Sequence, residues 1–409
     1  MLSINIVLFL LLKFFYSYDF FGTLIFGLFA LYNLERKKEY FIIYYLMMLM
    51  TNSGYIIMLV NSIIIFIYMY NITKKGRISK LTFYFILTIF TLSILTIFHY
   101  NSLHDILRLL IMFSSFAIFF LSIERINKLF VDKYIFLIYL ILFIAEITNI
   151  YLLNMPERDS IFNGGENIPI VIFLLLATYL FFSNTLTKYH KSLVGILYLM
   201  LIYSTDSRSV LIILITLTGL LVFKILLRYN KFIILFLLLF VSIILTTVTI
   251  NINADYNDSR ILSLIRDIEK VDLSNIYEYE KIDIRGLIYI EALDKISNAP
   301  LVGSGVVTPI VIKEEFGDKG MSSFHSSLFD VLVTYGFFGL IAIVVFFSYL
   351  FKKLIANNRE KLFFYIFIIV PFVVLSLIQP YFFNLQIISL LYVLLFIGSR
   401  ENQTGENIE

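Results

Sequence analysis

The sequence has no cysteine and only four histidines among its 409 residues. The lack of cysteine excludes disulfides, thiol chemistry and thiolate metal sites, and four histidines leave little room for a histidine metal site. Charged residues make up 15% of the chain, whereas about a quarter is usual in soluble domains. The patterns G-x-x-x-x-G-K-S/T, G-x-S-x-G and H-E-x-x-H do not occur. ATP-driven work and zinc-dependent hydrolysis therefore have no support.

Hydrophobic residues are more frequent than in soluble domains: they make up 60% of the chain, and the mean hydropathy is +0.91. A single soluble core stops growing at roughly 250–300 residues, so one core cannot hide this excess. We therefore predict an all-α polytopic membrane protein. Disorder, a disulfide scaffold and a nucleic-acid binder are excluded as overall classes.

Apolar segments long enough to cross a bilayer recur along the whole chain. A helix needs about 20 apolar residues to cross roughly 30 Å of hydrocarbon. We count about 14 spans, and 12 if the N-terminal segments do not all cross. The predicted spans are 2–16, 20–34, two short ones within 40–70, 81–98, 105–123, 134–153, 168–186, 191–204, 207–227, 231–250, 326–351, 361–379 and 384–398.

Clusters of lysine and arginine set the orientation, because such residues gather in cytoplasmic loops. If every basic cluster is cytoplasmic, the chain must cross the membrane an even number of times between one cluster and the next. Residues 40–70 must then form a hairpin with a turn at 51–54, and both termini are cytoplasmic. The first segment lacks a basic start and a small-residue cleavage site, so we predict a retained helix. The clusters are 36–38, 74–80, 125–133, 188–191, 224–231 and 352–361.

This topology leaves one large outward loop, which carries eight basic and 13 acidic residues. Helical spacing of apolar residues predicts two short amphipathic helices in it, one after Ser259 and one after Asp283, the second ending at 298–300. They lie on the bilayer surface or cap the helix bundle. The predicted parts are N-terminal transmembrane helices 1–250, an extracytoplasmic loop 251–325, C-terminal transmembrane helices 326–398 and a cytoplasmic tail 399–409.

Charges in or beside a membrane are costly, so each is a candidate functional group. Arg208 follows Asp206 where a short span returns outward, and it either pairs with Asp206 as a snorkelling arginine or binds an anion. Arg260 and Arg285 lie in the acidic loop, where local carboxylates can pair with them. Arg285 also opens the second amphipathic helix, whose backbone donors favour anions.

His325 is the last residue of the loop before a span. A single histidine at such a boundary is more often structural. An unperturbed imidazole has a pKa of about 6.5, however, which suits it to move a proton at neutral pH. Asp330, in the following span, either orients a neighbour or binds a group of the outer leaflet.

Three motifs occur in order: R-G-L-I-Y-I-E-A-L from Arg285, P-L-V-G-S-G from Pro300, and H-S-x9-G-F-F-G from His325. They resemble the signature region of the bacterial O-antigen polymerase/ligase family, and the S-R pair at 207–208 resembles an earlier element of it. The sequence departs from that pattern at Tyr289, where tryptophan is frequent, and at Ser326, where asparagine is common.

The resemblance implies transfer of a glycan from polyprenyl diphosphate to the hydroxyl of an acceptor sugar, at the outer face of the cytoplasmic (inner) membrane. It implies no nucleotide sugar, no metal and no other cofactor. Arg208 and Arg285, with Arg260 as a weaker third, would bind the diphosphate. Arg285 and His325 would be catalytic, His325 as a base or by positioning the acceptor.

Two glycines of the P-L-V-G-S-G motif, Gly303 and Gly305, form either a plain turn or a close backbone approach near the substrate. The implied partners are a polyprenyl-diphosphate-linked oligosaccharide and membrane lipid, with a chain-length regulator and a flippase as further candidates. No nucleic acid is expected.

A polymerase of O-antigen or capsule repeat units is the preferred interpretation, because the aromatic at Tyr289 is divergent and the composition is strongly biased. The alternative is an O-antigen ligase, which moves the finished polymer to a lipid or other acceptor. A different class is a lipid-linked oligosaccharide flippase or other transporter. Transporters often show internal repeats and short loops, and the sequence has neither feature.

Overall fold

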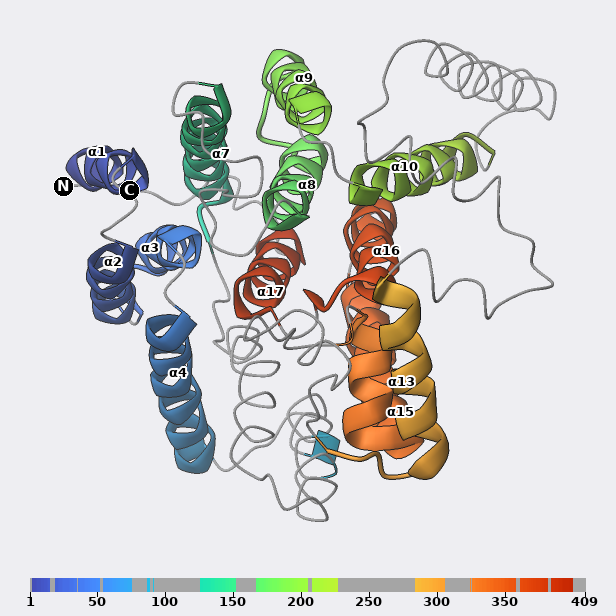
Figure 1. Ribbon diagram of the computed structural model, residues 1–409. Coiled ribbons are helices and arrows are strands. Elements are labelled where there is room, and N and C mark those ends of the chain that lie inside the picture. The colour runs from blue at the N-terminus through green and yellow to red at the C-terminus, as the bar shows by residue number, and fades with distance from the viewer. Residues whose placement is uncertain are drawn as a thin grey trace, which may run out of the picture.

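The computed structural model is all-helical, since the residues that it describes form twelve helices and no strand (Figure 1). This confirms the predicted all-α class. The described residues are 2–14, 19–34, 36–51, 54–75, 87–88, 91, 126–151, 167–204, 208–226, 284–305, 324, 326–357, 361–381 and 384–399. The helices are α1 (Leu2–Phe14), α2 (Asp19–Asn33), α3 (Lys38–Thr51), α4 (Gly54–Lys75), α7 (Lys128–Tyr151), α8 (Asn167–Phe182), α9 (Lys188–Ser204), α10 (Arg208–Leu226), α13 (Ile284–Asn298), α15 (Ser327–Asn357), α16 (Leu362–Ile378) and α17 (Leu385–Ser399).

The predicted apolar segments coincide with these helices wherever the structure describes them. The segment 40–70 is two helices, because α3 ends at Thr51 and α4 begins at Gly54. The amphipathic helix after Asp283 is α13, and it ends at Asn298 as predicted. The predicted spans 105–123 and 231–250, nearly all of 81–98, the helix after Ser259 and the tail beyond Ser399 lie outside the described residues.

One described helix is long and apolar enough to cross a membrane, the part of α15 from Ser327 to Ile355. Five shorter apolar helices also occur in the described part of the chain, within α2, α8, α10, α16 and α17. Their length falls short of about 20 residues. The number of crossings therefore stays a prediction.

The core is built around three helices that are buried on every side. Every residue is buried from Phe41 to Thr51 in α3, from Ile168 to Leu180 in α8 and from Gln386 to Gly398 in α17. A helix that is apolar all round belongs inside a helix assembly. α17 packs against both α3 and α8, and Figure 1 shows it between them.

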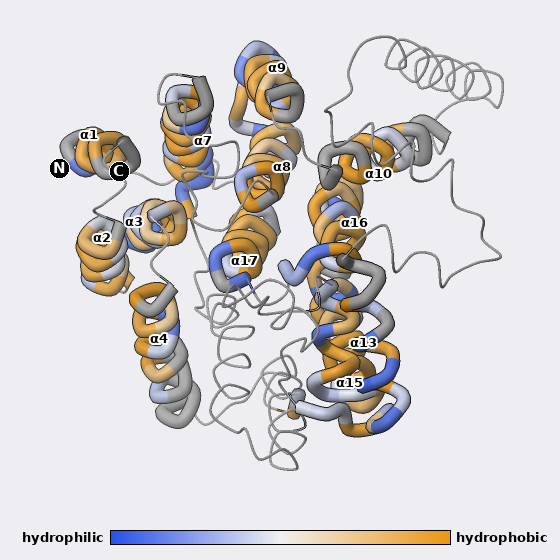
Figure 2. Tube along the Cα trace, in the orientation of Figure 1, coloured by the Kyte–Doolittle hydropathy of each residue, from blue (hydrophilic) through white to orange (hydrophobic). Residues whose placement is uncertain are grey.

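The outer helices expose large apolar side chains. Phe338 and Ile341 of α15 are 50% and 56% exposed, and Ile196 and Leu199 of α9 are 55% and 58% exposed. Figure 2 shows hydrophobic colouring along most of α2 and along parts of α9 and α10. Contiguous exposed apolar surface marks contact with lipid or with another protein.

Candidate functional site

Helix α13 lies along the first part of α15, and the two run parallel (Figure 1). Early in each helix, the rings of Tyr289 and Phe329 are in contact, with centroids 5.0 Å apart. After the end of α13, the N–H of Phe337 donates to the carbonyl of Pro300 at 2.9 Å. Residue numbers therefore increase in the same direction along both segments. In the same register, the N–H of Phe338 donates to the carbonyl of Leu301 (3.1 Å). The turn then folds back along α15, because the N–H of Ser304 donates to the carbonyl of Val333 (2.6 Å).

The contact between the turn and α15 is made by backbone, and two glycines allow it. Gly303 has φ 78° and Gly336 has φ 63°, a left-handed conformation that side chains disfavour. A Cβ on Gly303 would lie 2.5 Å from the carbonyl carbon and oxygen of Thr334, and one on Gly336 would lie 2.4 Å from those of Leu301. Gly336 also kinks α15, with ψ −166°. The close approach observed at Gly303 is to the backbone of α15. A position of Gly303 and Gly305 near the substrate stays a prediction.

The N-terminus of α15 is fixed by side-chain caps. The hydroxyl of Ser326 accepts from the N–H of Phe329 at 3.4 Å, which is a helix N-cap bond. Asp330 is buried, and its Oδ1 accepts from the N–H of Phe324 at 2.9 Å. Asp330 therefore orients the backbone that leads into the helix, one of the two roles predicted for it.

A small apolar cluster joins the two helices beside these caps. Ile288 and Ala292 of α13 are fully buried against Phe324 and Val333. Ile288, Ala292 and Ile296 lie four residues apart along α13 and therefore share one face of the helix. Burial of this face packs α13 on α15.

Two of the predicted site residues lie at helix starts. Arg285 lies in the first turn of α13, four residues before Tyr289, and Arg208 is the first residue of α10. α10 packs on α16, and α16 packs on α15. Only the backbone positions of these two arginines are described; Arg260 and His325 lie outside the described residues.

A second polar cluster, which sequence reasoning missed, lies where α7 meets the end of α8. The carboxylate of Asp132 is fully buried and accepts hydrogen bonds from the hydroxyls of Tyr179, Ser183 and Thr185, the last at 2.6 Å. Lys128, one turn earlier on α7, is 7% exposed. Burial lowers the pKa of Lys128, and the charge of Asp132 raises it in part. The only sequence signal was one carboxylate inside the basic cluster 125–133.

No group of three or more His, Asp or Glu side chains that could hold a metal ion occurs in the described part of the chain. The polar groups that join the turn after α13 to α15 and cap α15 are backbone amides, Ser326 and the carboxylate of Asp330. This arrangement is suited to holding two helix ends in fixed register.

Residues 171–344 match the family model described as O-antigen ligase. All of the predicted site residues fall inside this match, as do α13 and the kink of α15. A comparison with curated proteins gives no match.

Proposed function

We propose that the protein is a polysaccharide polymerase. Its residues 171–344 form a domain of the O-antigen polymerase/ligase family, which the signature residues predicted. It transfers a glycan from polyprenyl diphosphate to the hydroxyl of an acceptor sugar. Proteins of this family are glycosyltransferase-like and act on lipid-linked oligosaccharides. The donor, the absence of a metal and the outward-facing site are parts of the proposal.

The observation that carries the proposal is the parallel register of α13 and α15. Tyr289 and Phe329 are in ring contact. Arg285 is four residues before Tyr289, and His325 is four residues before Phe329. Both residues that flank His325 in sequence are buried, and Phe324 packs against Ile288 of α13. This register supports a shared location for the guanidinium and the imidazole.

The chemistry then follows from the two side chains. The acceptor hydroxyl oxygen attacks the anomeric carbon of the donor glycan, and the bond from that carbon to the diphosphate oxygen breaks. The hydroxyl proton passes to His325, and the electron pair leaves with the polyprenyl diphosphate. Arginines bind phosphate oxygens bidentately and stabilise the charge that develops there, so no general acid is needed. Arg285 and Arg208 take this role, with Arg260 as a third.

The membrane setting is supported by the exposed apolar faces of the outer helices. Proteins of this family are membrane proteins. A bilayer would cover side chains such as Phe338 and Ile341, which are half-exposed. We propose a multi-pass protein of the bacterial inner membrane in which the 251–325 segment faces outward. The lipid tail then stays in the bilayer while the sugars stay in water.

A ligase is the second candidate, because the matching family model is described as O-antigen ligase. The two activities differ only in the acceptor. In a deletion strain, accumulation of single-repeat glycolipid supports the polymerase, and long lipid-linked polymer that does not reach its acceptor supports the ligase. Repeat units stranded on the inner leaflet would instead indicate a transporter.

The site is tested in the same strain by complementation. His325→Ala should reduce polymer formation by about 10²–10⁴-fold, the usual contribution of a general base. Arg285→Lys and Arg208→Lys keep the positive charge but lose bidentate binding of the diphosphate, so they should also reduce polymer formation. His190→Ala is the matched control, since His190 is an exposed histidine of α9. With membrane expression confirmed, a full-length polymer ladder from His325→Ala would remove His325 from the mechanism.

A further inference from the structure

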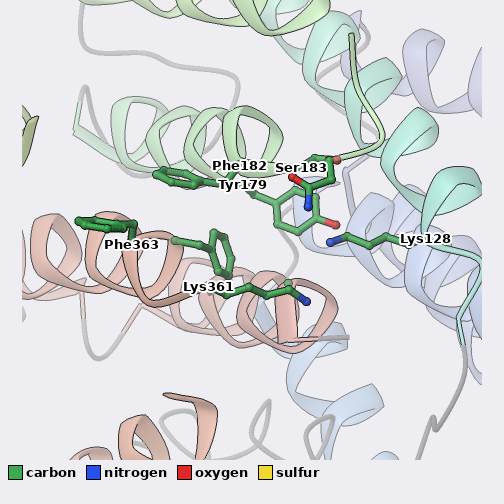
Figure 3. Close-up of a pocket in the computed structure, with 9 residues that line it drawn as sticks. Lys128, Tyr179, Phe182, Ser183, Lys361 and Phe363 are labelled. Carbon is green, nitrogen blue, oxygen red and sulfur yellow. The ribbon is translucent and has the colours of Figure 1, made fainter. Parts of the chain in front are cut away.

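A cavity of about 280 Å³ lies between the C-terminal end of α8 and the start of α16 (Figure 3). Figure 3 shows Lys128 reaching from α7 toward Tyr179, and Lys361 extending from the start of α16 toward the same space. The lining residues are Lys128, Tyr179, Phe182, Ser183, Asn184, Lys361, Phe363, Phe364 and Gly398.

The lining is cationic, because two lysines and no acidic residue contribute to it. Lys128 is 7% exposed, and it forms neither an ion pair nor a hydrogen bond with another described residue. The nearby carboxylate of Asp132 is instead held by three hydroxyls. Burying a cation without a direct partner is costly, and an anion in the cavity would remove that cost.

The size and the walls of the cavity restrict the class of ligand. Small-molecule pockets begin at roughly 300 Å³, so the cavity fits a headgroup-sized anion rather than an oligosaccharide. Phe182, Phe363 and Phe364 supply an apolar wall beside the lysines. Lysine binds phosphate as a point charge, and the rings can contact the carbon atoms attached to it. A phosphate with an organic substituent matches both features.

The cavity differs in location from the proposed transfer site. Lys128 and Lys361 belong to the basic clusters 125–133 and 352–361, which the sequence predicts to be cytoplasmic. Basic pockets between membrane helices on that side bind anionic lipid headgroups. We propose that this cavity binds a phosphate-bearing anion, and that the headgroup of an anionic phospholipid in the cytoplasmic leaflet is its source.

Thermal unfolding of the purified full chain in neutral detergent tests this proposal. Phosphatidylglycerol should raise the melting temperature of the wild type, and phosphatidylcholine should not. The Lys128→Gln/Lys361→Gln variant should lose the shift. Lys133→Gln/Lys353→Gln is the matched control, with the same charge change at two exposed lysines of α7 and α15, and it should keep the shift.

Inorganic phosphate distinguishes the two sources of the anion. Weak competition by phosphate against phosphatidylglycerol supports the lipid as the ligand, whereas saturation by phosphate alone, with no effect of the lipid, overturns that source. If the double variant does not fold, Lys361→Gln alone should weaken lipid binding about tenfold. An unchanged wild-type melting temperature with both probes, or equal shifts in variant and control, overturns the site. The assay measures binding only, so its outcome is independent of glycan transfer.

Discussion

The carboxylate of Asp132 is the best-satisfied buried charge at the α7–α8 junction. Its three hydroxyl donors come from Tyr179 at the end of α8 and from Ser183 and Thr185 just beyond it. A carboxylate that accepts several hydrogen bonds keeps its charge at low cost. Asp132 therefore anchors the end of α8 to α7 and leaves Lys128 facing the neighbouring cavity.

Replacement of Asp132 by alanine should destabilise the protein by about 3 kcal/mol or more, because buried hydroxyls would lose their acceptor. Asp294→Ala on the exposed face of α13 is the control and should change little. The measurement is thermal or denaturant unfolding in detergent. Equal stability of the two variants would show that the Asp132 cluster does not hold α7 and α8 together.

Lys128 should reduce stability in a way that depends on pH. Burial lowers its pKa below the ordinary 10.5, so the unfolded chain binds the proton more tightly than the folded protein does. The free energy of unfolding should then rise with pH between the lowered pKa and 10.5. Lys128→Met should remove this rise and stabilise the protein at lower pH, in detergent free of anionic lipid.

Melting temperatures at several pH values, with Lys133→Met as the exposed control, check this expectation. The gain from Lys128→Met should shrink as pH approaches 10.5. A variant that is less stable than the wild type at every pH would contradict the account of Lys128 as a buried cation without a direct partner.

At the scale of elements, the sequence predicted α13 well because its signal is local. Apolar spacing from Ile288 to Ile296 and the stop at Pro300 both lie within one helix and its turn. The docking of the turn onto Gly336 could not be predicted in the same way. A contact between two backbones leaves no side-chain pattern, and the glycines alone are equally compatible with a free turn.

Gly303→Ala and Gly336→Ala should separate α13 from α15. Each adds a Cβ within 2.5 Å of the facing backbone and at a positive φ. The left-handed conformation alone costs about 1–2 kcal/mol, and the overlap adds to it. Gly195→Ala and Gly219→Ala are matched controls in open space, with no atom within 4 Å of the new Cβ. Polymer formation and melting temperature should fall only in the first pair; a normal Gly336→Ala protein would contradict the observed contact.

At the scale of the molecule, the sequence predicted where helices lie but not how they are layered. Apolar runs are similar in α8 and α16, yet α8 is buried all round, whereas α16 exposes Val373 and Leu377. Burial is decided by neighbours far along the chain, which composition does not record. The charged site residues were predicted from their position beside the membrane and from motif order rather than from periodicity, because solvation and binding use the same side chains.

Cross-linking within a double-cysteine variant measures the central claim, the proximity of Arg285 and His325, most directly. The chain has no native cysteine, so Arg285→Cys/His325→Cys carries a single reactive pair. A protease site between the two positions reports the link as fragments that stay joined. Lys295→Cys/His325→Cys is the control, since position 295 lies about 15 Å further along the helix at roughly 1.5 Å per residue. The account predicts efficient disulfide formation in the first pair only; a link in the control pair with none between 285 and 325 would contradict it.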